Sequence, residues 1–423
     1  MANAQRGELM LEKYFCAPKT LRRLRGGISG SYVDGFAGVL QRDQYAQASA
    51  VRYIRAAAHL GCFIQRQGGV LANIDQNTLD SFCRHLRRCR CPHFKRGKIS
   101  YHSRFGVKLF RRYLVDCGIC PSDQPQNATE SPELVIAFRD WFQTHRGVKA
   151  PTLRQYVRGA TELLQALGED VGRWTAPAVR DYFLLRARQC GVPTTQRLTT
   201  SLRTFLRYLD FRGESRCDLT CAIPAVAHWR LARLPRCLSA EEVDRLIAAC
   251  NFANRGGLRD RAILLMLARL GLRSGDLAGL RLKDIDWING TLQVMGKGRY
   301  QVRLPLPQDV GDALLRYLER RPSNVDSDHV FVRCIAPYKP FISGDGISSV
   351  VKHSLKRAGI KTVAKGAHLL RHTAATEMLR NGVPLDQAGL VLRHRSIDMT
   401  AYYAKADVAL LKQVARPWPG VNR

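Results

Sequence analysis

The stretch His368-Leu369-Leu370-Arg371-His372-Thr373, near the C-terminal end of this 423-residue chain, decides how the rest of the sequence is read. His368 and Arg371 stand three positions apart, so a helix places both side chains on one face and directs His372 elsewhere. An arginine and an imidazole on one helical face suit a bound phosphate group. We therefore expect a helix here, in a domain that binds phosphate.

Further polar residues flank this stretch on both sides. Gly271-Leu272-Arg273 and Gly296-Lys297-Gly298 precede it, and His394 and Tyr403 follow it. Phosphoryl transfer without a metal ion needs a nucleophile, fixed cations on the phosphate oxygens and an acid for the leaving hydroxyl. Tyrosine, arginine, lysine and histidine can supply that set. Together these residues predict one phosphoryl-transfer site that uses neither a metal nor another cofactor.

The charge of the chain indicates a polyanionic partner. Its 67 Lys and Arg residues outnumber its 35 Asp and Glu residues, which leaves a formal net charge of +32 at pH 7. A field of this sign attracts nucleic acid over several ångströms. A membrane-surface protein would instead concentrate its charge on one amphipathic helix or beside an apolar anchor. We expect nucleic acid as the partner and no membrane.

The sequence contains no export signal or membrane span. The apolar run at residues 262–267 lies between Arg261 and Arg269 and is far shorter than the roughly 18 residues of a span. The first eight residues lack the apolar region of a signal peptide. The 13 cysteines are scattered through helical patterns, which favours reduced thiols over a disulfide framework. These features favour a cytoplasmic bacterial protein associated with the nucleoid.

Two stretches rich in turn-forming residues divide the chain into three folded regions. The first begins at Pro121, and the second runs from about Gly213 to Pro235. The expected organisation is an N-terminal tail (1–35), a basic helical domain (36–120), a linker (121–131), a second helical domain (132–212), a linker (213–236) and a C-terminal domain (237–423).

The two helical regions repeat one another. Three short segments recur in the same order, with residues 53–57 matching 156–160, residues 78–82 matching 178–182 and residues 110–114 matching 205–209. Chance similarity between amphipathic helices is the alternative, since such helices share a small set of residue types. Three matches in order favour duplication, and we infer a tandem pair of small helical domains.

A basic surface is expected on these helical domains. No acidic residue occurs between Asp80 and Asp116, although arginine and lysine are frequent there. That asymmetry is typical of a surface that contacts a phosphate backbone. The candidate nucleic-acid contacts are Arg84, Arg87, Arg88, Lys95, Arg96, Lys98, Arg111, Arg112, Arg158, Arg203 and Arg207.

The same basic stretch contains four residues of the types that bind zinc, namely Cys83, Cys89, Cys91 and His93. A structural zinc site usually pairs its ligands in Cys-x-x-Cys spacing, and the Cys-x-Cys-x-His spacing found here fits that pattern poorly. The spacing favours a basic interhelical loop, and we expect no metal in the chain.

The third region is expected to be mixed α and β. Ser239 and Glu242 predict a capping box at the start of a helix, and helical periodicity continues through residues 261–267. Residues 287–294 and 301–306 alternate as two strands about a turn, and helices resume after them. The predicted fold class is mainly α with a small β-sheet (α+β).

Over about residues 238–416 this region resembles the catalytic domain of the tyrosine recombinases, the phage-integrase and Xer-like family. The signature of that family is an arginine in a Gly-Leu-Arg turn, a lysine on a β-hairpin, His-x-x-Arg, a histidine or tryptophan, and a tyrosine nine residues further on. The chain has every element in this order. Residues 128–212 resemble the core-binding domain of the family. The resemblance implies tandem helical DNA-binding domains followed by a tyrosine-recombinase catalytic domain.

The resemblance implies that Tyr403 is the nucleophile, because it lies nine residues after His394 whereas the neighbouring Tyr402 does not. Its phenol, with an ordinary pKa of about 10, needs cations and a proton acceptor nearby in order to ionise. Lys297 is the implied general acid for the departing 5′-oxygen. His368 accepts or relays the tyrosine proton, and His394 donates a hydrogen bond to the phosphate.

Arg273 and Arg371 are the implied clamps on the non-bridging phosphate oxygens, since a guanidinium donates two parallel hydrogen bonds. Asp276, one helical turn past Arg273, is expected to pair with it as a supporting residue. Residues 408–414 predict a tail helix, which docks either in a neighbouring subunit or on its own domain. The expected assembly is a homo-tetramer on double-stranded DNA, formed alone or with a related recombinase.

The function implied is a site-specific DNA recombinase or integrase of the mobile-element type. It would cleave and rejoin strands through a 3′-phosphotyrosyl link without metal or ATP, since the covalent link conserves the energy of the broken bond. Two alternatives remain, a catalytically silent architectural DNA-binding protein and a DNA-relaxing enzyme of the type IB topoisomerase kind. The intact catalytic set disfavours the first, and the Xer-like spacing disfavours the second.

Overall fold

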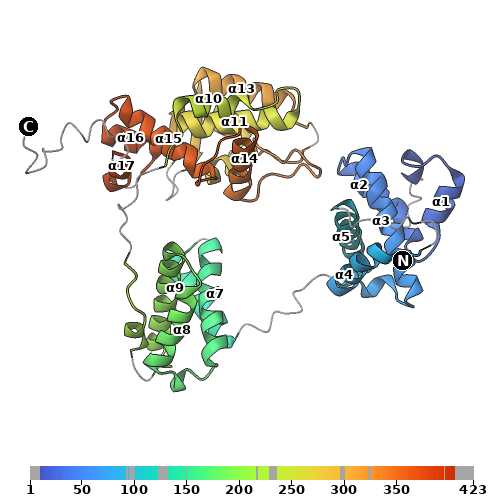
Figure 1. The fold of residues 1–423 in the computed structure, drawn as a ribbon, viewed down its shortest axis with the longest axis horizontal. Coiled ribbons are helices and arrows are strands. Elements are labelled where there is room, and N and C mark those ends of the chain that lie inside the picture. The colour runs from blue at the N-terminus through green and yellow to red at the C-terminus, as the bar shows by residue number, and fades with distance from the viewer. Residues whose placement is uncertain are drawn as a thin grey trace, which may run out of the picture. The chain divides into compact units, whose positions relative to one another are not determined.

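The computed structural model describes residues 10–91, 94, 101–121, 132–148, 150–215, 218–227, 236–295, 301–322, 325–394 and 396–404. These residues form many helices and one three-stranded antiparallel sheet of order β1-β2-β3 (Figure 1). The predicted fold class, mainly α with a small sheet, is confirmed. Among the described helices, none combines the length and apolar character that crossing a bilayer requires. The chain divides into two compact units, one of residues 1–120 with 233–423 and one of residues 121–232.

The N-terminal helical domain comprises, with η for a 3₁₀ helix, η1 (Met10–Lys13), α1 (Pro18–Arg25), α2 (Gly30–Arg42), α3 (Gln47–Arg66), η2 (Leu71–Asn73), α4 (Gln76–His85), η3 (Leu86–Arg88) and α5 (Tyr101–Asp116). Leu11, Phe15 and Leu24 are buried in its hydrophobic core. The expected tail at residues 1–35 is therefore wrong from residue 10 onward. Apolar side chains at the start of the chain complete this core, and that burial outweighs the weak helical signal of the segment.

The middle helical domain contains α6 (Glu133–Arg146), α7 (Ala150–Leu167), η4 (Val171–Arg173), α8 (Ala176–Arg188), α9 (Val192–Phe211) and η5 (Leu219–Ala222). Phe138, Leu163 and Phe205 lie at the centre of its core. A long helix, a 3₁₀ turn and two further helices follow one another here as they do from α3 to α5. Asp75 and Thr175 begin the corresponding helices α4 and α8 with side-chain N-caps.

The C-terminal domain contains α10 (Ala240–Ala248), α11 (Arg255–Leu270), α12 (Ser274–Gly279), η6 (Leu282–Asp284), β1 (Ile285–Asp286), β2 (Thr291–Met295), β3 (Gln301–Pro305), α13 (Gln308–Glu319), α14 (Gly344–Arg357), α15 (Ala367–Arg380), α16 (Leu385–Leu392) and α17 (Ile397–Ala404). The predicted capping box of Ser239 and Glu242 begins α10. Residues 262–267 of α11 are all at most 2% exposed, and α13, α14 and α15 pack around that helix. This buried apolar run makes α11 the central helix of the domain.

The sheet differs from its prediction at one end. β2 begins at Thr291, four residues after the predicted start, because residues 287–290 form a turn that joins it to β1. In that turn Gly290 has a φ of +59°, which favours glycine, and the Asn289 N–H donates to the Asp286 carboxylate at 3.0 Å. β2 and β3 pair from Thr291↔Pro305 to Met295↔Gln301. The predicted tail helix at 408–414 lies outside the described residues.

Candidate active site

Arg273 is positioned by the left-handed turn that ends the central helix, α11. Gly271 ends α11 with a φ of +56°, and a Cβ on it would come within 2.7 Å of Leu392 Cδ2. Leu272 is fully buried, and Arg273 then becomes the residue before α12. Its Nη2 donates to the carbonyl of Arg393 at 2.9 Å. The Gly-Leu-Arg pattern is thus explained by a left-handed turn, a buried anchor and a cation aimed at the end of α16.

Arg371 lies on α15 and is 4% exposed. Its guanidinium donates to the carbonyls of Gly271 and Leu392, so it joins the end of α11 to the end of α16. Burial, helped by the charge of Arg273, lowers the pKa of Arg371 to about 10, and the residue remains a cation at neutral pH. Both candidate arginines are thereby fixed against the segment that leads into His394.

Asp276 has a different principal partner from the one expected. One carboxylate oxygen accepts the backbone N–H of Arg273 at 3.1 Å and also pairs with Nη2 of Arg393 at 2.5 Å. The ion pair joins side chains that are 12% and 4% exposed. Arg393 has a φ of +56°, a conformation that non-glycine residues rarely adopt. Asp276 thus fixes the backbone of Arg273 and the strained residue next to His394.

The three histidines of the site are kept neutral at physiological pH. Burial is the main cause, and the charge of Arg371 adds to it in each case. The pKa of His368 is lowered, and those of His372 and His394 are lowered to about 4. The His394 Nδ1 lies 2.8 Å from the Thr400 hydroxyl, a hydrogen bond that links it to α17. A neutral imidazole can accept a proton, which is the role predicted for His368.

Tyr403 lies inside this group of residues. It is 5% exposed, and its ring stacks on that of His394 with centroids 5.8 Å apart and planes 7° apart. Burial raises the pKa of its phenol, although Arg371 and Arg273 act in the opposite direction. The expectation that nearby cations favour the phenolate therefore does not describe the DNA-free chain, in which burial prevails. Tyr402 is half-buried beside it, with ring centroids 5.5 Å apart.

Two residues near the tyrosine were missed or misplaced by sequence reasoning. His372, expected to point elsewhere, has its ring centroid 5.3 Å from that of Tyr403, because α17 packs against α15 from that side. Arg393 gave no signal as the partner of Asp276.

Lys297 lies outside the described residues. The strands on either side of it pair as an antiparallel hairpin, and Met295 and Gln301 face each other in the final described pair.

The predicted nucleic-acid contacts divide into three groups. Those with exposed side chains are Arg84, Arg87, Arg88, Arg112, Arg158 and Arg207. Two others take part in the fold. Arg111 is 8% exposed and its Nε donates to the Ile74 carbonyl at 2.7 Å, and Arg203 donates to the Ile223 carbonyl at 2.7 Å. Arg111 is therefore a wrong prediction, because its guanidinium is used within the domain. Lys95, Arg96 and Lys98 lie outside the described residues.

Sequence comparisons relate the chain to known proteins. Residues 236–409 match the model of the phage integrase family. A putative integrase/recombinase, y4rA of Sinorhizobium fredii (strain NBRC 101917 / NGR234), is 44% identical over 96% of the chain and 99% of its own length. The tyrosine recombinase XerA of Pyrococcus furiosus is 28% identical over 66% of the chain and 92% of its own length.

Solved structures share the fold. XerH site-specific recombinase, bound to a palindromic difH substrate after cleavage, matches 93% of each chain with a TM-score of 0.53 and 16% identity. A lambda integrase dimer bound to a COC′ core site matches 68% of this chain and 98% of that one, with a TM-score of 0.51 and 17% identity.

Proposed function

This chain belongs to the phage integrase family of tyrosine recombinases, and from that premise we propose that it is a site-specific DNA recombinase whose nucleophile is Tyr403. The observation that carries the assignment is the convergence of Tyr403, His394, Arg371 and Arg273 at the meeting point of α12, α15, α16 and α17. Four residues spread over 131 positions of sequence share one site, and each type has a use in phosphoryl transfer.

The proposed reaction exchanges one phosphoester for another. The Tyr403 oxygen bonds to the scissile phosphorus as the bond to the 5′-oxygen breaks, leaving a 3′-phosphotyrosyl link and a free 5′-hydroxyl. The tyrosine proton passes to His368, and Lys297 protonates the departing 5′-oxygen. Reversal of these steps with the 5′-hydroxyl of another strand rejoins the DNA without ATP.

Arg273 and Arg371 hold the phosphate in this proposal. Charge grows on the non-bridging oxygens as the phosphorus becomes five-coordinate, and guanidinium groups fixed in advance stabilise it. The backbone carbonyls that both arginines contact provide that fixing. His394, stacked on the Tyr403 ring, donates the further hydrogen bond to the phosphate.

The raised pKa of the Tyr403 phenol suggests that DNA binding contributes to activation of the nucleophile. In the DNA-free chain burial holds the Tyr403 phenol in its protonated form. Because unperturbed phenol already ionises only near pH 10, we expect little phenolate at neutral pH before DNA binds. Proton transfer to an imidazole during attack avoids the need for a free phenolate.

The N-terminal helical domain supplies a basic surface for the DNA backbone. Arg104, Lys108 and Arg112 are exposed and recur every four residues along α5, so they form one stripe. Arg84, Arg87 and Arg88 are exposed at the end of α4 and in η3. Phosphate contacts of this kind predict steeply salt-dependent binding. We further propose assembly as a tetramer on two DNA sites, in a mobile-element setting that the additional N-terminal domain favours.

The test traps the covalent link. The full chain is incubated with a library of end-labelled, nicked duplexes of random sequence, with no added divalent ion and no chelator, and adducts are recovered on denaturing gels. We expect a labelled adduct with wild type and with Tyr402→Phe, and at least about a 1,000-fold loss with Tyr403→Phe.

A silent architectural protein would bind these duplexes without any adduct. Binding without linkage by the wild type, or linkage that survives in Tyr403→Phe, would overturn the assignment. Relaxation of a single supercoiled circle without exchange between two sites would instead indicate the topoisomerase alternative.

A further inference from the structure

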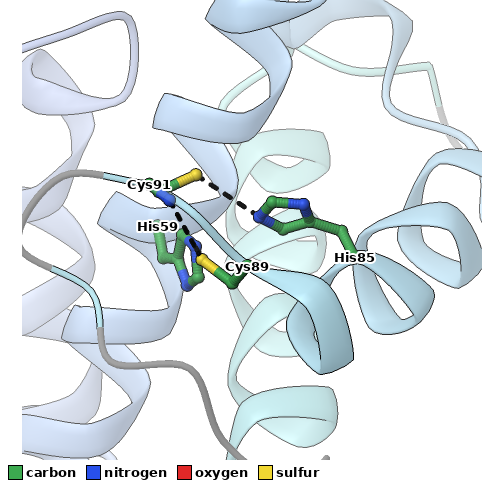
Figure 2. Close-up of side chains that lie close together, drawn as sticks. All are labelled: His59, His85, Cys89 and Cys91. Atoms are coloured by element: carbon green, nitrogen blue, oxygen red, sulfur yellow. Dashed lines mark hydrogen bonds between the residues drawn. The ribbon is translucent and has the colours of Figure 1, made fainter.

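The N-terminal helical domain brings together a second group of chemically reactive side chains. His59 comes from the middle of α3, His85 is the last residue of α4, and Cys89 and Cys91 follow η3 (Figure 2). Their ligand atoms all lie within 4.8 Å of one another. We propose that these four residues bind one structural zinc ion.

Two donor distances in the cluster are close to those around a bound zinc ion, and the others reach at most 4.8 Å. Cys89 Sγ lies 3.2 Å from His59 Nε2, and Cys91 Sγ lies 3.3 Å from His85 Nε2. With Zn–S near 2.3 Å and Zn–N near 2.0–2.1 Å, tetrahedral donors stand roughly 3.3–3.8 Å apart. Movements of about 1 Å or less would bring the four atoms to that spacing.

Two separate thiol–imidazole hydrogen bonds are the simpler explanation of the short distances. They account for each pair but not for the convergence of two pairs from three segments of the chain. Two thiolates and two imidazoles form the ligand set typical of zinc, and four protein ligands close its coordination shell. A closed shell serves structure and leaves no position for catalysis.

The surroundings favour metal-bound thiolates. The backbone N–H of Cys91 donates to Cys89 Sγ at 3.3 Å, and Arg66 Nη1 donates to Cys91 Sγ at 3.5 Å. Donors around the sulfurs are the outer contacts that metal thiolates usually receive. His59, Cys89 and Cys91 are at most 5% exposed. Because two thiolates balance the charge of Zn²⁺, the whole group can be buried at low electrostatic cost.

Apolar contacts shield the cluster and fix its orientation. The ring of Phe94 stacks on His59 with centroids 4.1 Å apart and planes 5° apart, and Phe82 meets the same imidazole edge-on at 5.1 Å. The metal would tie α3 to the end of α4 and to the residues that follow η3.

The ligand set differs from the one that the sequence made visible. Cys89 and Cys91 belong to both sets, but His59 and His85 take the places of Cys83 and His93. Cys83 is buried outside the group, and His93 lies outside the described residues. Spacing alone could not find His59, which stands 26 positions before its nearest partner in sequence.

The first test measures metal in the full chain. Protein is expressed with added zinc and purified by gel filtration. Inductively coupled plasma mass spectrometry should then find about one zinc ion per chain. Replacement by Co²⁺ should give thiolate-to-metal charge-transfer bands and the strong visible bands of tetrahedral cobalt. A chain that purifies without zinc and gives neither set of bands would overturn the proposal and leave two hydrogen-bonded pairs.

Matched variants identify the ligands. His85→Ala and Cys91→Ser should lower the zinc content to background, whereas His85→Cys should retain zinc and shift the cobalt spectrum towards three thiolates. Cys83→Ala is the control, because it removes a buried thiol three residues from the start of η3 without touching the proposed set. Zinc loss in Cys83→Ala, or undiminished zinc in Cys91→Ser, would contradict the assignment.

Cys62 is another thiol near the cluster, and burial raises its pKa with a smaller contribution from Cys91. Cys62→Ser should keep about one zinc per chain with an unchanged cobalt spectrum; loss of zinc in this variant would contradict the four-residue set. The metal test is independent of the phosphotyrosyl test, since zinc content is read without DNA and the Tyr403→Phe variant should keep its zinc.

Discussion

In each helical domain two long helices cross closely, α3 with α5 and α7 with α9. The crossings lie at equivalent repeat positions, but the glycine that permits close contact is on the second helix in one domain and on the first in the other. In the N-terminal domain Gly106 of α5 lies against α3, where a Cβ would stand 3.3 Å from Ala56 Cβ. In the middle domain Gly159 of α7 lies against Ser201 of α9, where a Cβ would stand 2.4 Å from Oγ. The repeat aligns Ala56 with Gly159 and Gly106 with Ser201. The close crossing is shared by the two domains, whereas the residue that permits it differs.

The domains differ more strongly in the side chains that connect their first long helix, α3 or α7, to the end of the following helix, α4 or α8. The repeat aligns His59 with Glu162. His59 meets Cys89 in the buried cluster, while Glu162 of α7 pairs with Arg186 of α8 at 2.8 Å through side chains that are 26% and 32% exposed. In the N-terminal domain the two segments meet through a buried histidine and cysteine, and in the middle domain they meet through a partly exposed ion pair. The same helical frame thus tolerates two kinds of chemistry at one position.

The largest expected effect tests whether the two cores are equivalent. Phe110 and Phe205 occupy matching repeat positions, and both are fully buried. Either change to alanine should destabilise its own domain by about 3–5 kcal/mol through lost burial and a cavity. Hydrogen exchange of α5 and α9 amides measures each domain separately. A loss below about 1 kcal/mol in one of them would break the equivalence.

Metal removal should separate the two domains. If zinc is present at about 1,000 times its dissociation constant, stripping it removes about 4 kcal/mol from the N-terminal domain. Amide exchange in α3 should then accelerate while exchange in α7 stays constant, because Glu162 and Arg186 bind no metal. Equal acceleration in both helices would indicate that the chelator acts elsewhere.

The helix crossing offers a reciprocal test. Gly159→Ala should destabilise the middle domain by about 1–3 kcal/mol, because the new methyl group overlaps Ser201. Adding Ser201→Gly recreates the arrangement of the N-terminal domain and should recover most of that loss in thermal unfolding. If the double variant is no more stable than Gly159→Ala alone, the two crossings are not interchangeable.

The smallest effect concerns the ion pair. Burial raises the pKa of Glu162, but hydrogen bonds from Arg158 and Arg186 outweigh it, so the pKa is lowered from 4.5. A lowered folded pKa stabilises the domain above about pH 4.5, and the contribution disappears as the pH falls through the folded value. Glu162→Gln should cost only about 0.2–1 kcal/mol at pH 7 and flatten the acid limb of the unfolding curve. An unchanged acid limb would show that the pair contributes nothing.

The sequence predicted most of the frame because local signals were strong. Ser239 with Glu242 marked a helix start, and the apolar run at 262–267 marked the central helix. The strand alternation located the hairpin around Lys297, although the turn at 287–290 shortened its first strand. Residues 10–35 were wrongly predicted to be a tail. Leu11 and Phe15 are buried only because later helices complete the core around them, and no local pattern reveals that.

The candidate site was predictable in its residue types and less so in its contacts. The order and spacing of Arg273, Arg371, His394 and Tyr403 can be read directly from the sequence. The approach of His372 to the tyrosine depends on where α17 packs, which no local pattern states. Likewise Arg111 reads as a surface cation, and only the path of the chain near Ile74 shows why it is buried.

The hydrogen bond from His394 to Thr400 couples the candidate histidine to the helix that carries Tyr403. Thr400 is fully buried on α17, less than one turn before Tyr403. A displacement of α17 as a whole would move Tyr403 and Thr400 together and break the hydrogen bond to the imidazole. In the proposed mechanism, a shift of α17 as a unit would therefore withdraw the nucleophile and release the phosphate-binding imidazole in one movement.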